Sequence, residues 1–287
     1  MVNEIKVSCI ILSNLNDKFV KRRTIPSIIA NSQFESIEII VVDNSPEQDF
    51  ERDYPVGLNN VKIHTSEPFH IAKGYNKGVQ EASGKYIAIF HDDCEVRDED
   101  WIVKFTRVLN DKVYAVSPQL HHQKTTTKNE FTQVDSIVQP RGAYFQEYLK
   151  ECPLVMERDK FLEVGGYDET YYFGYEDIRF TDSINNLDKH IMQVDIGFKH
   201  YNGMSTVLLA HLNDKEKLEE YKNLFCDIED KSEFRNIFNS DKVKQFFKKL
   251  VGFEWPSCET GSDKSWQDCE KDMPKTKEEL YKFIGEL

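Results

Sequence analysis

The sequence has no long hydrophobic run. Its longest apolar stretches, among them residues 9–12 and 39–42, are only a few residues long, whereas a helix that spans a membrane needs about 20 apolar residues. An acidic side chain lies close to the first residue and no small-residue cleavage site follows it, so we expect no signal peptide. These absences favour a cytoplasmic protein that does not cross a membrane.

Positive charge and paired cysteines are also scarce. The 37 Lys and Arg residues are outnumbered by 50 Asp and Glu residues, which gives a net charge of -13 at pH 7. Nucleic acids and anionic membranes attract basic clusters, so we expect neither as a partner. The 6 cysteines include no CxxC pair, which excludes zinc-finger spacing, and a chain of 287 residues needs no disulfide framework. Free thiols in a reducing compartment are therefore expected.

Two glycine-rich motifs that bind phosphate groups are missing as well. Neither GxxxxGK[ST] nor GxGxxG occurs, which excludes a phosphate-loop enzyme and a dinucleotide dehydrogenase. The segment SNLNDKFVKRR after the first apolar run contains no glycine, whereas a sugar nucleotidyltransferase carries a glycine-rich, basic loop there. A sugar nucleotidyltransferase is therefore only an alternative.

The sequence does contain short β-branched apolar runs that alternate with helical patterns. The expected strands include residues 6–12, 37–42, 61–64 and 86–90, and the expected helices include residues 72–82 and residues 19–31, with a kink or restart at Pro26. Strands and helices that alternate at this spacing predict an α/β fold with a mostly parallel central sheet and helices on both faces.

Polar residues follow several of these expected strands. Ser13, Asp43 and the pair Asp92 and Asp93 all stand at carboxyl ends of strands, where ligands of such sheets bind. Two plain alternatives remain open here. Asp43 can form the turn of the Asp-Asn-Ser-Pro segment, and the two adjacent aspartates can be a solvated turn.

Four segments, in this order, resemble glycosyltransferase family 2. They are IEIIVVDNS (residues 37–45), NKGVQEASGKYIAIFHDD (76–93), GGYDETYYFGYED (165–177) and HYNGMS (200–205). The resemblance covers residues 7–205 and implies a GT-A domain over residues 1–210. It further implies an inverting enzyme that moves a sugar from a nucleotide diphosphate donor, most often a UDP-sugar, to an acceptor hydroxyl.

The resemblance implies a divalent metal site. Asp93 would bind the ion, His200 would complete its shell, and Asp92 would contact the ribose or a metal-bound water. Such an ion neutralises the leaving diphosphate, and a shell of oxygen and imidazole suits Mn²⁺ better than Mg²⁺. His200 can instead be an ordinary histidine. His91 stands where the family often has a first Asp, and we predict no role for it.

The donor nucleotide has further candidate contacts in the resemblance. Asp43 would accept a hydrogen bond from the base, and Ser13, Asn76 and His70 are weaker candidates on the donor side.

On the acceptor side, the resemblance makes Asp177 the general base and Glu176 the residue that holds the acceptor. A carboxylate suffices as the base, because the hydroxyl becomes acidic only as it bonds to the anomeric carbon. Acidic residues also favour the first turn of a helix, which gives a purely structural alternative for the pair. Two residues after this pair, Arg179 replaces an acidic residue that is usual in the family. The sequence therefore departs from the family pattern at a position that bears on acceptor recognition.

The rest of the chain suggests how an acceptor is chosen. We expect a glycan or lipid-linked glycan acceptor, as in polysaccharide biosynthesis, selected by residues 121–150 and by a helical C-terminal extension over residues 211–287. A helix in residues 242–255 has Val243, Phe246, Phe247, Leu250 and Val251 on one face. We expect this face to dock onto the catalytic domain, with an interfacial membrane helix as the alternative.

A module without catalysis is the remaining alternative. It would bind a nucleotide or a glycan on a transferase scaffold. The presence of both Asp93 and Asp177 argues against it, because binding alone needs no base.

Overall fold

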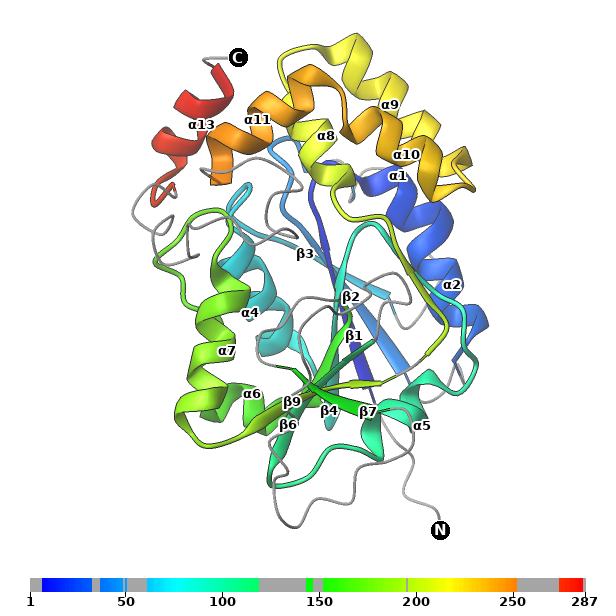
Figure 1. Ribbon diagram of the computed structural model, residues 1–287, viewed down its shortest axis with the longest axis vertical. Coiled ribbons are helices and arrows are strands. Elements are labelled where there is room, and N and C mark those ends of the chain that lie inside the picture. Colours follow the sequence, from blue (N-terminus) through cyan, green and yellow to red (C-terminus); the bar gives the residue numbers. More distant parts are fainter. Residues whose placement is uncertain are drawn as a thin grey trace.

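A computed structural model describes residues 7–32, 37–48, 50, 61–118, 143–146, 152–194, 196–251 and 274–285. An eight-stranded sheet crosses its centre in the order β3-β2-β1-β4-β8-β6-β9-β7 (Figure 1). The strands are β1 (Val7–Ser13), β2 (Ile37–Asp43), β3 (Val61–Thr65), β4 (Tyr86–His91), β6 (Val113–Pro118), β7 (Ala143–Gln146), β8 (Leu154–Glu157) and β9 (His190–Val194).

Counted from one edge of the sheet, the first four strands (β3, β2, β1 and β4) are parallel to one another. Strands β6 and β9 are also a parallel pair. The strand β8 runs antiparallel between β4 and β6, and β7 runs antiparallel to β9. The predicted α/β architecture with a mostly parallel sheet is confirmed. Strand β6 had not been predicted, and β7 lies in the segment 121–150, where loops with one short strand were expected.

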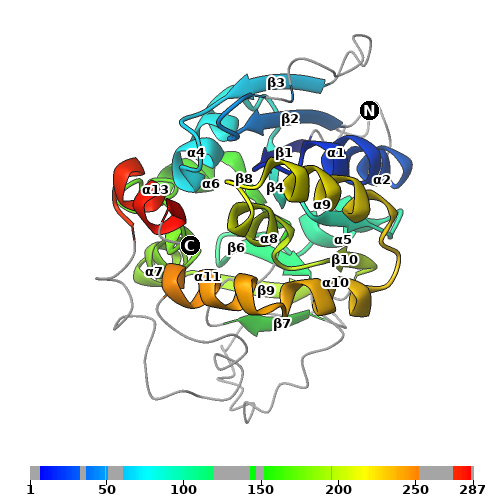
Figure 2. The same ribbon diagram turned by 90° about the horizontal axis from the view of Figure 1, so that it is seen from above.

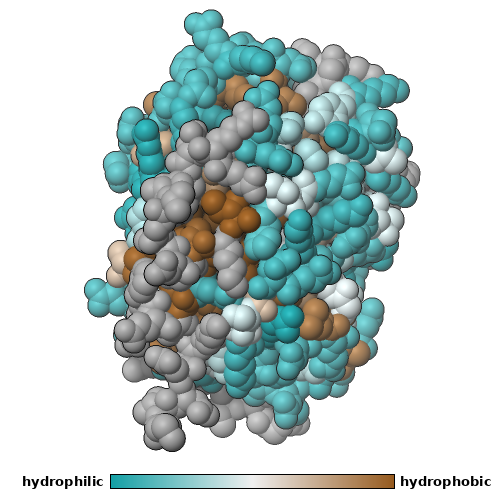
Figure 3. All heavy atoms as spheres, turned by 180° about the vertical axis from the view of Figure 1, so that it is seen from behind, coloured by the Kyte–Doolittle hydropathy of each residue, from teal (hydrophilic) through white to brown (hydrophobic). Residues whose placement is uncertain are grey.

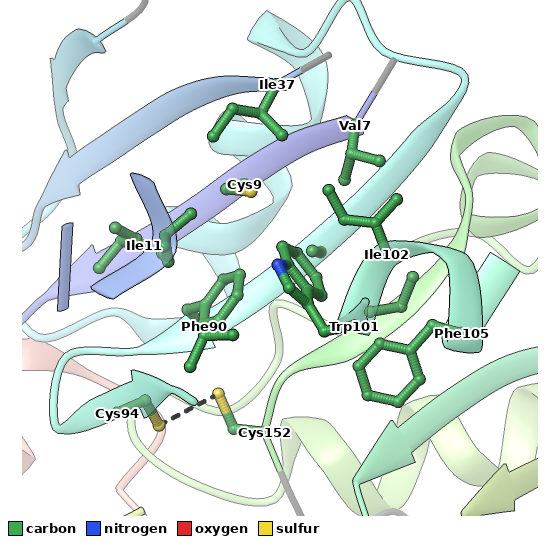
Figure 4. Packing of buried hydrophobic residues seen from close by; sticks show 14 of the residues in the cluster. Val7, Cys9, Ile11, Ile37, Phe90, Cys94, Trp101, Ile102, Phe105 and Cys152 are labelled. Atoms are coloured by element: carbon green, nitrogen blue, oxygen red, sulfur yellow. Dashed lines mark hydrogen bonds between the residues drawn. The ribbon is translucent and has the colours of Figure 1, made fainter. Parts of the chain in front are cut away.

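Side chains alternate between the two faces along each buried strand. Apolar residues therefore lie on both faces of the sheet, and helices cover both. On β1, Cys9 and Ile11 pack with α2 (Ile25–Ala30) and α5 (Trp101–Thr106), as Figure 4 shows for part of this cluster. Ile10 and Leu12 point to the other face. That face is covered by α4 (Ile71–Glu81), α6 (Arg158–Glu163) and α7 (Glu176–Asn186).

Two glycines let α4 approach β1 closely. A Cβ atom at Gly74 would lie 2.3 Å from the Leu12 side chain, and one at Gly78 would lie 2.4 Å from Ile10. Because real Cβ contacts are not that short, a larger residue at Gly74 would displace the end of the Leu12 side chain, and one at Gly78 would displace Ile10.

The segment after β1 is helical, as predicted, and Pro26 does not break it. The helix α1 (Asp17–Phe19) continues into a π-helical turn, η1 (Val20–Thr24), and then into α2. Pro26 lies in the first turn of α2. The wider turn before it accommodates a residue that has no N–H to donate.

Further helices gather over the carboxyl ends of the parallel strands (Figures 1 and 2). They are α8 (Met204–Ala210), α9 (Lys215–Asp227), α10 (Lys231–Phe238), α11 (Asp241–Val251) and α13 (Lys277–Gly285). Their apolar side chains share one cluster with Leu15, Phe19 and Tyr201. Val243 and Phe246 of α11 are fully buried in it, so this helix docks onto the rest of the chain.

No helix in the described residues is long and apolar enough to cross a membrane. The face seen in Figure 3 is mostly hydrophilic, with hydrophobic side chains exposed at several separate places. The cysteines at 9, 94, 152 and 226 are free thiols, and all four are buried. Cys258 and Cys269 lie outside the described residues, as does most of the segment 121–150 that was assigned to acceptor choice.

Candidate metal centre and catalytic site

A small two-stranded sheet brings His200 to the end of β4. The strand β5 (Cys94–Val96) pairs antiparallel with β10 (Phe198–His200), with Cys94 opposite His200. The Tyr201 N–H extends the pairing by donating to the Asp93 carbonyl oxygen at 3.2 Å. As a result, His200 Nε2 lies 3.0 Å from Asp93 Oδ1, and both side chains are buried.

His91 completes a group of three potential ligands. Its Nδ1 lies 3.3 Å from His200 Nε2, and the ligand atoms of His91, Asp93 and His200 all lie within 4.8 Å of one another. Neighbouring ligands of an octahedral ion with bonds of about 2.1 Å are about 3 Å apart. The three residues therefore fit a divalent cation. Asp93 and His200 were predicted as metal ligands from the sequence, whereas His91 was not.

The second oxygen of Asp93 faces a helix N-terminus. Asp93 Oδ2 accepts hydrogen bonds from the Gly203 N–H at 2.9 Å and from the Met204 N–H at 3.2 Å, where α8 begins. Burial acts to raise the pKa of Asp93, but the charge and hydrogen bond of His200 outweigh it and hold that pKa below its ordinary value. Asp93 is therefore an ionised carboxylate.

Asp92 has hydrogen-bond partners outside this group. Asp92 Oδ2 accepts from the Asn14 N–H at 2.7 Å, and the Ser205 hydroxyl donates at 2.8 Å. Burial and the neighbouring charge of Asp93 raise the pKa of Asp92 to about 7. The Asp92 carboxyl thus joins the segment after β1 to α8, and its predicted ribose contact stays a prediction.

Asp43 organises the turn after β2. Its Oδ1 accepts from the Ser45 N–H at 3.0 Å and its Oδ2 from the Phe50 N–H at 2.9 Å. The turn-forming role considered for Asp43 is therefore present in the structure. A carboxylate can accept further bonds, so a base contact is compatible with this arrangement and stays a prediction.

Unpartnered polar atoms lie beside Asp43. Ser13, which pairs with Asp43 in the sheet, is fully buried, and within the described part of the chain its hydroxyl has no hydrogen-bond partner. The same holds for both side-chain polar atoms of Asn44 and for Asn14 Oδ1. Because an unsatisfied buried group costs about 1–3 kcal/mol, this group of atoms is suited to a polar ligand.

The other two donor-side candidates have structural contacts. His70 caps α4, with its Nδ1 accepting from the Lys73 N–H at 3.4 Å, and burial lowers its pKa. Asn76 Nδ2 donates to the Tyr167 carbonyl oxygen at 2.9 Å, and the Tyr167 N–H donates to Asn76 Oδ1 at 2.9 Å. Asn76 thereby joins α4 to the segment before α7. The donor roles of His70 and Asn76 stay predictions.

Glu176 and Asp177 form the first turn of α7. The chain enters this helix through Gly174 at φ 80° and Tyr175 at φ 71°, and a positive φ is uncommon for tyrosine. Burial raises the pKa of Asp177 to about 6, although the Ile178 N–H donates to Asp177 Oδ1 at 2.7 Å. Burial and the charge of Asp177 raise the pKa of Glu176 to about 8.

Tyr75 packs between His91 and Tyr167. The Tyr75 ring centroid is 6.5 Å from that of His91 and 5.5 Å from that of Tyr167. The charges of Glu176 act on the pKa of both tyrosines, after burial as the main cause of their raised pKa values.

Buried thiols support the segment between His91 and Cys94. The His91 N–H donates to Cys152 Sγ at 2.7 Å, and the Cys94 and Cys152 sulfur atoms are 3.6 Å apart (Figure 4). Burial is the largest cause of the raised pKa of Cys94. Both thiols pack under the segment, and the raised pKa of Cys94 keeps that thiol protonated.

Known proteins similar to this chain are sugar transferases. A curated relative, the glucosyl-dolichyl phosphate glucuronosyltransferase of Haloferax volcanii, is 25% identical over 240 residues, which are 77% of this chain and 72% of the relative. Two solved structures share the GT-A fold at lower identity. The mannosyltransferase PcManGT of Pyrobaculum calidifontis, solved with GDP-Man and Mn²⁺, is 13% identical with a TM-score of 0.50 and matches 68% of this chain. GalNAc-T7, solved with UDP, GalNAc and Mn²⁺, is 14% identical with a TM-score of 0.53 and matches the whole chain.

This chain spans only 56% and 57% of the lengths of those two structures. The model of glycosyl transferase family 2 matches residues 9–161, which include most of β1, the predicted donor side and the segment from His91 to Asp93. That is more than half of the chain. The protein is a glycosyltransferase, and it belongs to glycosyl transferase family 2.

Proposed function

We propose that this glycosyltransferase is metal-dependent and inverting, and that it moves a sugar from a UDP-sugar to a hydroxyl group of a glycan or lipid-linked glycan. In this proposal, residues 1–210 form the catalytic domain and residues 211–287 form a helical extension that takes part in acceptor binding. The observation that carries the proposal is the convergence of Asp93 and His200 at the carboxyl edge of the sheet, 3.0 Å apart.

The donor would lie across the ends of β1, β2 and β4. Asp93 and His200 would hold a divalent ion, and Mn²⁺ is proposed over Mg²⁺ because imidazole is among the ligands. The ion would supply neutralisation of the leaving diphosphate. Ser13 and Asp43 would contact the nucleoside, and the unpartnered buried atom of Ser13 supports this part of the proposal. Asp92 would act beside them.

The acceptor would lie on the side of α7. Asp177 is proposed as the general base and Glu176 as the residue that holds the acceptor. At neutral pH, Asp177 with a pKa of about 6 is largely ionised and still basic enough to accept a proton as the hydroxyl attacks. Glu176, with a pKa of about 8, is largely protonated and can donate a hydrogen bond to the acceptor. Direct displacement with one base inverts the anomeric centre.

The names of similar proteins support two parts of this proposal. The relative in Haloferax volcanii is named for glucosyl-dolichyl phosphate, which is a lipid-linked sugar. Both solved structures carry Mn²⁺, one with GDP-Man and the other with UDP and GalNAc. The proposal of a UDP-sugar as donor therefore rests on the family resemblance alone. The identity of the donor is the first property to test.

The experiment begins with a panel of nucleotide sugars. Each is mixed with the purified chain and Mn²⁺, and both the melting temperature and the release of free nucleoside diphosphate are recorded. We expect a UDP-sugar to give the largest stabilisation and to be hydrolysed slowly without acceptor. NMR of the transferred sugar then reports the anomeric configuration, which should be opposite to that of the donor.

Three outcomes would change the proposal. Stabilisation without any release or transfer would favour a silent binding module. Release of pyrophosphate from a sugar phosphate and UTP would favour a nucleotidyltransferase. Retention of the anomeric configuration would remove the single-base mechanism, although not the transferase activity.

A further inference from the structure

His91 was given no role in the predicted metal site, yet its ring lies beside the predicted ligand His200. Its Nδ1 lies 3.3 Å from His200 Nε2, the same nitrogen that lies 3.0 Å from Asp93 Oδ1. A neutral imidazole carries one N–H. A single proton on His200 Nε2 can serve Asp93 or His91 well, but not both. A cation placed between the three atoms satisfies all of them at once.

The backbone and the neighbouring rings fix the position of His91. Its N–H donates to Cys152 Sγ at 2.7 Å, beyond the last paired residue of β4 with β8. Its ring lies between Tyr75, with an interplanar angle of 28°, and His200, with an angle of 71°. Although His91 is exposed at the surface, its Nδ1 points inward, so a cation can be reached without rearranging the strand.

The three side chains form a particular ligand set. Two imidazoles and one carboxylate within 4.8 Å of one another would supply three ligands to an ion, fewer than the six that an octahedral ion takes. Such a set favours divalent transition ions, whereas Mg²⁺ prefers oxygen ligands alone. The remaining positions are where the oxygens of a diphosphate can bind.

We propose that His91 is a third protein ligand of the metal ion, beside Asp93 and His200, and that it sets a preference for Mn²⁺ or Co²⁺ over Mg²⁺. This inference rests on the proposed metal site. It goes beyond that site because it assigns the selectivity of the ion to a residue that replaces an aspartate of the family pattern.

The test measures metal binding rather than transfer. The full chain is titrated with MnCl₂, CoCl₂ or MgCl₂ alone and again with saturating UDP. Free Mn²⁺ is followed by electron paramagnetic resonance, bound Co²⁺ by its visible absorption, and Mg²⁺ by its competition with Mn²⁺. The variants are His91→Ala, His91→Asp, Asp93→Ala and His200→Ala. His64→Gln is the control, because His64 lies on β3, three strands from β4.

We expect His91→Ala to weaken Mn²⁺ and Co²⁺ binding at least about tenfold and to change the Co²⁺ spectrum, with Mg²⁺ binding altered less than about twofold. His91→Asp keeps three ligands but replaces an imidazole by a carboxylate. It should bind Mg²⁺ more tightly than the parent does, so that the preference for Mn²⁺ over Mg²⁺ falls by at least about tenfold. His64→Gln should match the parent throughout.

The outcomes separate the two proposals. If Asp93→Ala and His200→Ala weaken Mn²⁺ binding while His91→Ala and His91→Asp leave affinity, selectivity and the Co²⁺ spectrum unchanged, the inference about His91 is wrong and the metal site stands. If the parent binds no ion with or without UDP, or if Asp93→Ala and His200→Ala bind as the parent does, the metal site of the proposed function is wrong. Melting curves of each variant establish that it is folded. If His91→Ala does not fold, His91→Asp provides a second test of the same position.

Discussion

Asp92-Asp93 and Glu176-Asp177 are both pairs of adjacent acidic residues, but their surroundings differ. Asp93 accepts two backbone N–H groups where α8 begins and lies 3.0 Å from His200, and its pKa is held below the ordinary value. Asp177 accepts one N–H, from Ile178, and burial raises its pKa. The same kind of side chain therefore has a lowered pKa on one side of the site and a pKa raised towards neutral pH on the other.

This difference matches what each chemical role requires. A carboxylate that binds a cation must stay ionised, whereas a general base works best with a pKa near the working pH. Neighbouring groups, rather than residue type, set the two pKa values. The comparison can therefore be tested by removing either carboxylate or by changing the proton concentration.

The largest effect is expected from Asp93→Ala. Losing a metal ligand removes several kcal/mol of stabilisation from the leaving diphosphate, and each 1.36 kcal/mol is tenfold in rate. Transfer should fall by at least about 10³, and Mn²⁺-dependent stabilisation by UDP should disappear. Rates and melting curves with and without Mn²⁺ measure both. Asp159→Ala, which removes an exposed acidic residue on α6, is the control. Undiminished turnover in Asp93→Ala would remove the metal assignment.

Asp177→Asn should have the next largest effect. Asparagine has nearly the same shape and keeps the start of α7 polar, but it cannot accept the proton of the acceptor. Transfer should fall by about 10²–10⁴, the usual contribution of a positioned base, with donor affinity unchanged. A purely structural role predicts only a change of about 0.3–1 kcal/mol in stability, from a lost charge at the helix N-terminus.

Melting temperature, donor affinity and transfer rate of Asp177→Asn are measured on one preparation. A variant that melts earlier and still transfers sugar at the parent rate would show that Asp177 is only a helix-end charge. Glu176 would then be the first candidate for the base.

The pH profile should show a smaller effect of the same group. Because Asp177 must be ionised to accept a proton, and burial raises its pKa from 3.8 to about 6, transfer should decline below about pH 6. The decline should be about tenfold per pH unit. Rates are measured at saturating donor and acceptor, with saturation by Mn²⁺ verified at every pH. A profile that stays flat down to about pH 4 would show a solvated carboxylate instead.

Sequence patterns predicted the parts of this site that depend on local order. The strands β1, β2 and β4 are short, mostly apolar runs, and Ser13, Asp43 and Asp93 stand where these strands end. The pairing of β5 with β10 was not predictable, because each strand has 3 residues and such a short run has no measurable period.

The same limit explains why His91 was missed. His91 and His200 are 109 residues apart in sequence, and only the β5–β10 pairing brings them together. Likewise, no local pattern indicates that Asn76 of α4 bonds to Tyr167, which is 91 residues away. Long-range contacts of this kind decide which polar residues at the strand ends face the site and which hold it together.

Asn76 should give the smallest effect, and it tests what holds the acceptor side in place. Its amide group makes hydrogen bonds of 2.9 Å with both the N–H and the carbonyl oxygen of Tyr167, and its Nδ2 also donates to Glu169 Oε1 at 2.9 Å. Asn76→Ala leaves the backbone groups of Tyr167 without these partners, which should lower the free energy of unfolding by about 1–3 kcal/mol. We expect the Asn76 amide to act on the segment that carries Asp177 and not on the donor, so donor affinity should stay within about twofold of the parent. A tenfold loss of affinity would correspond to about 1.4 kcal/mol. Urea unfolding and a UDP titration with Mn²⁺ measure the two quantities, with Lys73→Ala on the exposed side of α4 as the control. Unchanged stability together with donor affinity weakened tenfold or more would mean that Asn76 contacts the nucleotide, as the family resemblance implies, and that the acceptor side is held by other contacts.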